Sequence, residues 1–127
     1  MARFFHPNVK WYGPGGIGGC LSLREFEDFH QKPWLVAFPD RKVGDLDNLF
    51  AEGDFVGASS LPGVHATHTG PYQGHPASGR KTGHNGIDFW RRDGDQFTEN
   101  WVFVDMLHLF GQMGVDLMAR VQQLETK

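Results

Sequence analysis

Three features are scarce in this sequence, and each scarcity excludes a class of protein. Cys20 is the only cysteine among 127 residues, so no internal disulfide can form and a reducing, cytoplasmic location is expected. No apolar run is long enough to span a membrane, and the N-terminus becomes polar too early for a signal peptide. The formal net charge of −3 at pH 7 is unlike that of nucleic-acid-binding proteins, which are usually basic. We therefore expect neither a membrane nor a nucleic acid as a partner.

Glycine and aromatic residues, by contrast, are abundant. The 17 glycines indicate many turns and a chain rich in β-structure. The 11 phenylalanines and 4 tryptophans can fill a core or line a pocket for a flat organic ligand, and composition alone does not separate these uses. The length fits a single domain over residues 1–127, which is large enough to bury a core.

Residues 86–105 predict a β-hairpin that ends in a carboxylate. Asp93-Gly94 is a strong turn signal, and aromatic and β-branched residues occupy both arms. Side chains alternate along a strand, so Trp101, Phe103 and Asp105 share one face of the second arm. If this face lines a cavity, Asp105 lies among aromatic rings, and loss of solvent raises its pKa toward the range useful for proton transfer. The alternative is that Asp105 caps the helix that follows, and the spacing leaves both interpretations open.

The first arm of the hairpin supplies a second acid. His84, Asp88 and Trp90 share one face of this arm, which makes Asp88 a further candidate for a buried acid. The alternative for Asp88 is an exposed and weak ion pair with a neighbouring arginine.

Two histidines upstream, His65 and His68, are not expected to form a metal site. Their offset of three residues places the two rings on opposite faces of a strand, and no further ligand pattern accompanies them. One ring can face a cavity while the other faces outward. Asp45 and Asp47 could form a pair of carboxylates, although a solvated strand face is the commoner arrangement.

Two segments near the N-terminus have more than one interpretation. Residues 13–18 match the G-x-G-x-x-G pattern of dinucleotide-binding loops, but a proline lies inside the loop and repeated strand–helix alternation is missing. A loop at the mouth of a pocket is the simpler interpretation. Ser22 and Glu25 form a capping box at the start of a helix, which Pro33 is expected to kink or restart. In this helix His30 lies on or beside the buried face, where histidines are usually hydrogen-bonded core residues rather than catalysts.

Several short motifs follow one another along the chain in a specific order. They are Ala37–Asp40, Ala51–Asp54, Thr67–Arg80, Asp88–Arg92, Glu99–Asp105 and Gln112–Gly114. In this order and spacing they resemble the SnoaL-like polyketide cyclase family, of the nuclear-transport-factor-two-like superfamily, over residues 8–114.

The resemblance implies an α+β fold, in which a curved, mostly antiparallel sheet forms a cone-shaped barrel with a few covering helices. It also implies a homodimer formed through the sheet, a small-molecule ligand in the cone, and ring closure by aldol condensation without a metal or cofactor. The acid/base carboxylate of the family lies on the late strand, which corresponds to Asp105. The family normally begins with helices, whereas this chain begins almost directly with a strand, so we expect a compact variant or one half of a tandem pair.

The resulting hypothesis is a cyclase or isomerase that acts on a small, apolar carbonyl compound. Asp105 removes a proton next to the carbonyl group, and a neutral His68 or His84 donates a hydrogen bond to the enolate oxygen. The side chains expected to contact the ligand are Trp11, Phe38, His65, Trp90, Trp101 and Phe103. The alternative function is a non-catalytic binding module for a hydrophobic ligand, in which Asp105 only orients the ligand or caps a helix.

Overall fold

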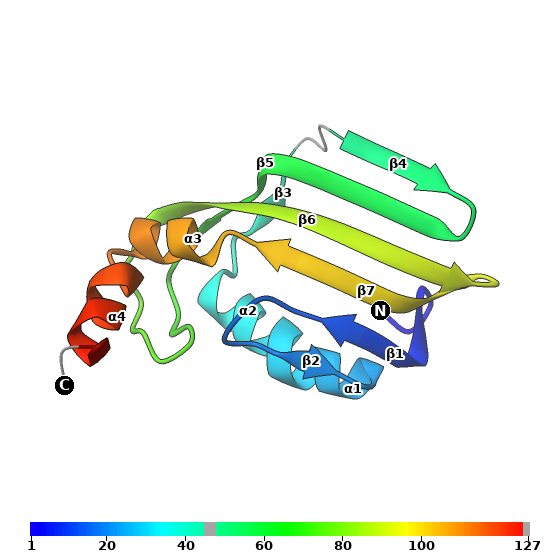
Figure 1. Ribbon diagram of the computed structural model, residues 1–127, viewed down its shortest axis with the longest axis horizontal. Coiled ribbons are helices and arrows are strands. Elements are labelled where there is room, and N and C mark those ends of the chain that lie inside the picture. Colours follow the sequence, from blue (N-terminus) through cyan, green and yellow to red (C-terminus); the bar gives the residue numbers. More distant parts are fainter. Residues whose placement is uncertain (45–47, 126–127) are drawn as a thin grey trace.

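The computed structural model describes residues 1–44 and 48–125, and its largest feature is a curved, mostly antiparallel sheet (Figure 1). The order of the strands is β2-β1-β7-β6-β5-β3, and β4 pairs with the same strand, β5, as β3 does. Only β1 and β7 run parallel. The strands are β1 (Phe5–Tyr12), β2 (Gly19–Cys20), β3 (Lys42–Val43), β4 (Asn48–Glu52), β5 (Phe55–Thr67), β6 (Lys81–Asp93) and β7 (Gln96–Val104). The expected α+β fold with a curved antiparallel sheet is confirmed, whereas Asp45 and Asp47 lie outside the described residues.

One continuous helical segment, interrupted by a π-helical turn, follows the first two strands. Its parts are α1 (Leu23–Phe26), η1 (Glu27–Gln31) and α2 (Lys32–Ala37). Ser22 caps its start, because the Ser22 hydroxyl accepts a hydrogen bond from the Glu25 backbone N–H at 3.2 Å. Pro33 explains the π turn, since a proline has no N–H to donate and its ring clashes with the carbonyl four residues earlier. The segment therefore widens ahead of Pro33 and continues without a break.

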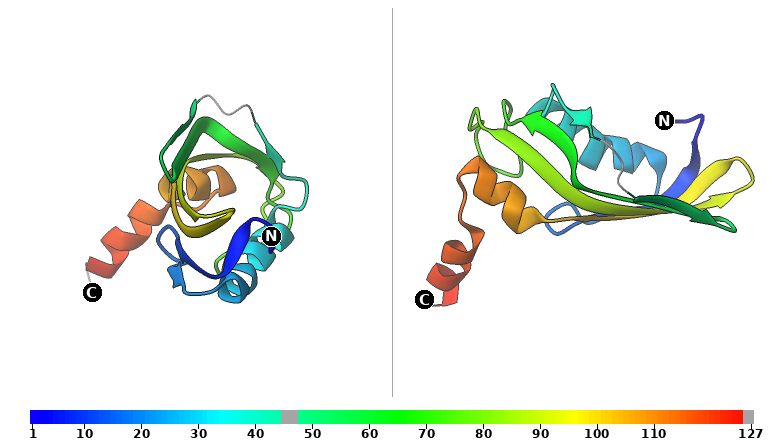
Figure 2. Two further views of the ribbon diagram at one scale, coloured as in Figure 1. Left: turned by 90° about the vertical axis from the view of Figure 1, so that its right-hand side faces the viewer. Right: turned by 90° about the horizontal axis from the view of Figure 1, so that it is seen from above.

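The helical segment lies on the concave side of the sheet, as a view along the long axis shows (Figure 2, left). Two further helices follow β7: α3 (Met106–Met113) lies at one end of the sheet, and α4 (Leu117–Glu125) projects from the body. Gly114 ends α3 in the left-handed conformation, which glycine adopts without strain. None of the described helices is long and apolar enough to cross a membrane.

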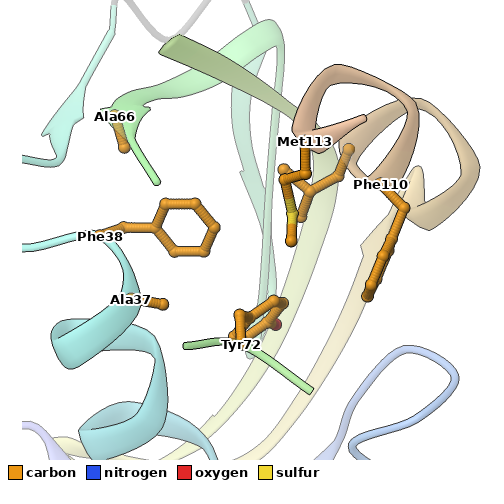
Figure 3. Packing of buried hydrophobic residues seen from close by; sticks show 7 residues of the cluster. Ala37, Phe38, Ala66, Tyr72, Phe110 and Met113 are labelled. Atoms are coloured by element: carbon orange, nitrogen blue, oxygen red, sulfur yellow. The ribbon is translucent and has the colours of Figure 1, made fainter. Parts of the chain in front are cut away.

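Buried apolar residues form two clusters. The first cluster joins β1, β2 and α1 and consists of Val9, Trp11, Cys20, Leu23 and Phe26. The second joins the end of α2, β5 and α3 and consists of Ala37, Phe38, Ala66, Tyr72, Leu109, Phe110 and Met113 (Figure 3). Phe38 is fully buried here, and its ring meets that of Tyr72 edge-on at a centroid distance of 5.3 Å.

The hairpin predicted at Asp93-Gly94 is present, and Gly94 adopts the positive φ of 57° that its turn requires. The pairing of its two strands changes by one residue close to the turn. Arg92 lies opposite Phe97, but the next residue back, Arg91, lies opposite Glu99, so that Thr98 is an extra residue in β7. This is a β-bulge.

The bulge decides which side chains of β7 face the concave side. Beyond it, Trp90 lies opposite Asn100 and Asp88 lies opposite Val102. Because a shift of one residue turns every later side chain to the other face, Asn100 and Val102 share a face with Asp88. A regular hairpin would have placed Trp101 there.

The glycine-rich loop joins β1 to the antiparallel strand β2. A dinucleotide-binding loop must lead from a strand into a helix, so that interpretation of residues 13–18 is wrong.

Candidate active site

A cavity of about 420 Å³ lies between the helical segment and the concave face of the sheet. This volume is within the range of roughly 300–1,000 Å³ that is usual for small-molecule sites. Both apolar clusters contribute to its wall, the first through Trp11 and Phe26 and the second through Tyr72 and Leu109. Pro14 and Ile17 of the glycine-rich loop also line the cavity, which agrees with the expected position of that loop.

Asp88 provides the carboxylate of this cavity. Among the described residues that line the cavity it is the only acidic side chain, and none of them is a lysine or arginine. Burial raises the pKa of Asp88 to about 6, and a hydrogen bond from Asn100 opposes that rise. The Asn100 amide lies 3.5 Å from Asp88 Oδ1 and donates to the Phe89 carbonyl at 3.1 Å. The site therefore holds one carboxyl group whose pKa is close to neutral pH.

The arginines next to Asp88 do not neutralise it. Arg91 pairs with Glu99, and Arg92 pairs with Asp54, where the nitrogen–oxygen distance is 3.5 Å. Because the side chains of Arg91 and Glu99 lie on the opposite face of the hairpin, the exposed ion pair considered for Asp88 is wrong.

Asp105 is not in the cavity. Its side chain is exposed, and its Oδ1 accepts a hydrogen bond from the His108 backbone N–H at 2.9 Å at the start of α3. The expectation of a desolvated Asp105 among aromatic rings is therefore wrong, and the alternative of a helix cap is confirmed. The cause is the bulge at Thr98, which turns the whole face containing Asp105 away from the concave side.

The same bulge separates the expected aromatic contacts. Trp11 and Trp90 line the cavity. Trp101 and Phe103 instead lie on the convex face, where Trp101 stacks on Tyr12 at 5.7 Å and Phe103 is 60% exposed. Placing Trp101 and Phe103 in the cavity was wrong.

Three other expected site residues also lie away from the cavity wall. His65 is exposed on β5, whereas His68 is fully buried and accepts a hydrogen bond from the Ser78 backbone N–H at its Nδ1, at 3.2 Å. Burial lowers the pKa of His68. Phe38 packs against His68 within the second cluster and does not line the cavity. These three residues were wrongly expected to contact a ligand or its enolate oxygen.

His84 does line the cavity, and its hydrogen bonds indicate its tautomer. The Thr82 hydroxyl donates its single hydrogen to the Ala66 carbonyl at 3.2 Å. The oxygen of that hydroxyl can then only accept from His84 Nε2, which lies 3.1 Å away. Burial lowers the pKa of His84 to about 4, so the ring is neutral at pH 7. The proton is on Nε2, and Nδ1 is left as an acceptor rather than the donor that an enolate needs.

His30 lines the cavity as well, although nothing in the sequence distinguishes it from an ordinary core histidine. Its ring stacks on Trp11 at 4.4 Å and on Trp34 at 5.8 Å. Burial lowers its pKa to about 4. Helical spacing correctly placed His30 on the buried face, but spacing alone does not reveal whether a filled core or a cavity lies against that face.

Comparison with known families agrees with this architecture. A model of the SnoaL-like polyketide cyclases matches residues 1–113. The chain belongs to the SnoaL-like polyketide cyclase family. Among curated protein sequences no significant match was found.

Solved structures related to this SnoaL-like chain share its fold. A candidate SnoaL-like polyketide cyclase from Jannaschia sp. CCS1 is 18% identical with a TM-score of 0.80, and the match covers 90% of this chain and 76% of that one. A candidate polyketide cyclase from Acidithiobacillus ferrooxidans is 28% identical with a TM-score of 0.72, over 89% and 79% of the two chains. A protein with a ketosteroid isomerase-like fold from Catenulispora acidiphila is 12% identical with a TM-score of 0.69, over 88% and 78%.

Proposed function

We propose that this SnoaL-like protein is a cyclase or isomerase in which Asp88 moves a proton next to a carbonyl group of a small, apolar ligand. The observation that carries the proposal is the position of Asp88, a carboxyl group with a pKa of about 6 in a largely apolar cavity. A base with such a pKa is mostly ionised at pH 7, and its conjugate acid is strong enough to return the proton.

The proposed reaction needs two transfers and no other reactant. Ionised Asp88 takes a proton from the carbon next to the carbonyl, which becomes an enolate. The enolate carbon then attacks a second carbonyl of the same molecule, and the alkoxide oxygen formed there takes the proton back from the Asp88 carboxyl group. In an isomerisation the Asp88 carboxyl group instead returns the proton to another carbon of the enolate. Asn100 supports the first step, because its hydrogen bond stabilises the ionised form of Asp88.

The cavity also restricts the ligand. It contains one carboxylate and no cationic side chain among its described lining residues, so an anionic ligand would meet repulsion without a partner. An uncharged, flat ligand fits the aromatic wall formed by Trp11, Trp34 and Trp90.

Asp88→Asn tests the proposed base. The measurement is the exchange of deuterium into uncharged cyclic ketones and β-diketones, followed by NMR at pH 7. We expect the exchange rate catalysed by the protein to fall by about a hundredfold or more in Asp88→Asn, which is the usual contribution of a general base. The matched control is Asp105→Asn, which alters an exposed acid and should leave the rate within about twofold.

Three results decide between the functions. A pH–rate profile with a midpoint near 6 that is lost in Asp88→Asn supports proton transfer by Asp88. An unchanged rate in Asp88→Asn contradicts it. Binding of these ketones without any exchange above that in buffer supports the binding module instead.

We also propose that a second copy of the chain covers the convex face of the hairpin. Ile87 and Phe103 lie opposite each other on this face and are 43% and 60% exposed. A contiguous apolar patch of this kind is typical of an interface. Sedimentation equilibrium tests the homodimer, and a monomer at all micromolar concentrations would contradict it.

A further inference from the structure

His30 presents an unexplained feature of the cavity wall. Its Nδ1 is buried and has no hydrogen-bond partner within the described part of the chain. A buried polar atom without a partner costs free energy, and such atoms in folded proteins are few. A phenylalanine at this position would keep the aromatic stack and avoid that cost, so stability alone does not account for a histidine.

The ring of His30 is held in a fixed orientation. Trp11 and Trp34 stack on it with interplanar angles of 20° and 16°, and Phe26 lies against it at 5.5 Å. Its backbone belongs to the π-helical turn η1, a conformation that recurs at functional sites. Three aromatic rings therefore pack against the His30 ring, which restrains its orientation at the cavity wall.

The enclosed position of Nδ1 indicates which ring nitrogen of His30 can contact a ligand. His30 lines the cavity, and Nδ1 is enclosed without a partner whereas Nε2 is not among the enclosed atoms, so Nε2 is the nitrogen open to a ligand. A neutral ring with its proton on Nε2 leaves only a bare acceptor enclosed at Nδ1 and presents an N–H donor at Nε2.

We propose that His30 binds the ligand through this Nε2–H, which donates a hydrogen bond to the carbonyl oxygen. His84 offers the opposite group, an Nδ1 acceptor, because its own Nε2–H is directed to Thr82. The cavity thus holds one donor and one acceptor on neutral rings, which suits a ligand with both a carbonyl and a hydroxyl group. The inference rests on the proposed function only in taking the cavity as the ligand site.

A pair of probes tests the donor without any turnover. 2-Acetylnaphthalene carries a carbonyl group, and 2-isopropenylnaphthalene has the same shape with CH₂ in place of the oxygen. Binding of each is followed by quenching of tryptophan fluorescence, since three tryptophans line the cavity. The measured quantity is the ratio of the two affinities.

We expect His30→Phe to reduce this preference for the ketone by about three- to tenfold, the usual worth of one hydrogen bond. Binding of the hydrocarbon should change little, and the melting temperature should stay equal or rise because the unpaired nitrogen is gone. His65→Phe, the same substitution at an exposed histidine outside the cavity, should leave the ratio unchanged.

Two substitutions with amide side chains test which position on His30 carries the hydrogen-bond donor. The amide of His30→Gln reaches the position of Nε2 and should retain part of the preference, whereas that of His30→Asn reaches only the position of Nδ1 and should not. The proposal is overturned if His30→Phe leaves the affinity ratio unchanged or lowers both affinities equally. It is also overturned if His30→Asn retains the preference for the ketone and His30→Gln does not. A failure of Asp88→Asn to alter proton exchange would leave these results intact, so the two proposals fail separately.

Discussion

The two faces of the β6–β7 hairpin are built from alternating residues of the same strands, yet they have opposite properties. The concave face holds Asp88 and Asn100 in the wall of the cavity. The convex face exposes Ile87 and Phe103 and carries the Arg91–Glu99 ion pair. Residues adjacent in the sequence thus differ in solvent exposure, charge and side-chain contacts, although they belong to the same strands. The comparison teaches that the register of this hairpin, more than its composition, determines where chemistry is available.

Shifting the register of β7 is the strongest way to break this difference. Insertion of one alanine between Asn100 and Trp101 would keep the bulge but turn Trp101 and Phe103 toward the cavity and Val102 away from it. Because two large rings would then have to enter the interior, we expect a loss of about 3 kcal/mol or more in the free energy of unfolding. Thermal unfolding followed by circular dichroism measures it.

The control for the insertion is Thr98→Ala. It keeps the register and removes only the hydrogen bond from the Thr98 hydroxyl to the Arg91 carbonyl, at 3.4 Å, so it should cost about 1 kcal/mol or less. An insertion protein as stable as Thr98→Ala would refute the role given to the register of this hairpin.

The second prediction uses pH to separate the faces. Burial raises the pKa of Asp88 from 3.8 to about 6, so the folded state binds its proton more tightly than the unfolded state does. This favours the folded protein while the group is protonated, and the advantage is lost as pH rises from about 4 to above 6. Asp88→Asn should therefore be more stable than the native protein at pH 7, by up to about 3 kcal/mol, and the difference should vanish near pH 3.

Denaturant unfolding at several pH values measures this difference. Asp105→Asn is the matched variant on the solvent-exposed side. Equal pH dependence of the two variants would mean that Asp88 is as well solvated as Asp105.

The smallest effect is expected on the convex face. Phe103→Thr replaces a side chain that is 60% exposed with another good strand former, so the unfolding free energy of the monomer should change by about 0.5 kcal/mol or less. If a second copy covers this face, the same substitution weakens the dimer. Unfolding and sedimentation of the same sample distinguish the two effects, and a large loss of stability in the monomer would show that Phe103 packs within its own chain.

Local signals in the sequence predicted much of the fold, including the capped helix at Ser22 and the turn at Asp93-Gly94. They could not predict the bulge, because Thr98 suits a strand whether it is paired or extra. One unrecognised residue was enough to exchange Asp105 for Asp88 as the acid in the cavity. The helix pattern likewise placed His30 on a buried face, but a pattern cannot distinguish a wall beside empty space from a packed interior.

The parallel pairing of β1 with β7 has a consequence for how the protein folds. Lys10 pairs with Glu99, almost the whole chain away, while β5, β6 and β7 join neighbours through nearby turns. Closing so long a loop carries an entropic cost that local hairpins avoid, and contacts of this kind slow folding. We therefore expect β1, which carries Trp11, to dock after β5, β6 and β7 have paired. Until β1 docks, the cavity lacks the part of its wall that Trp11 forms.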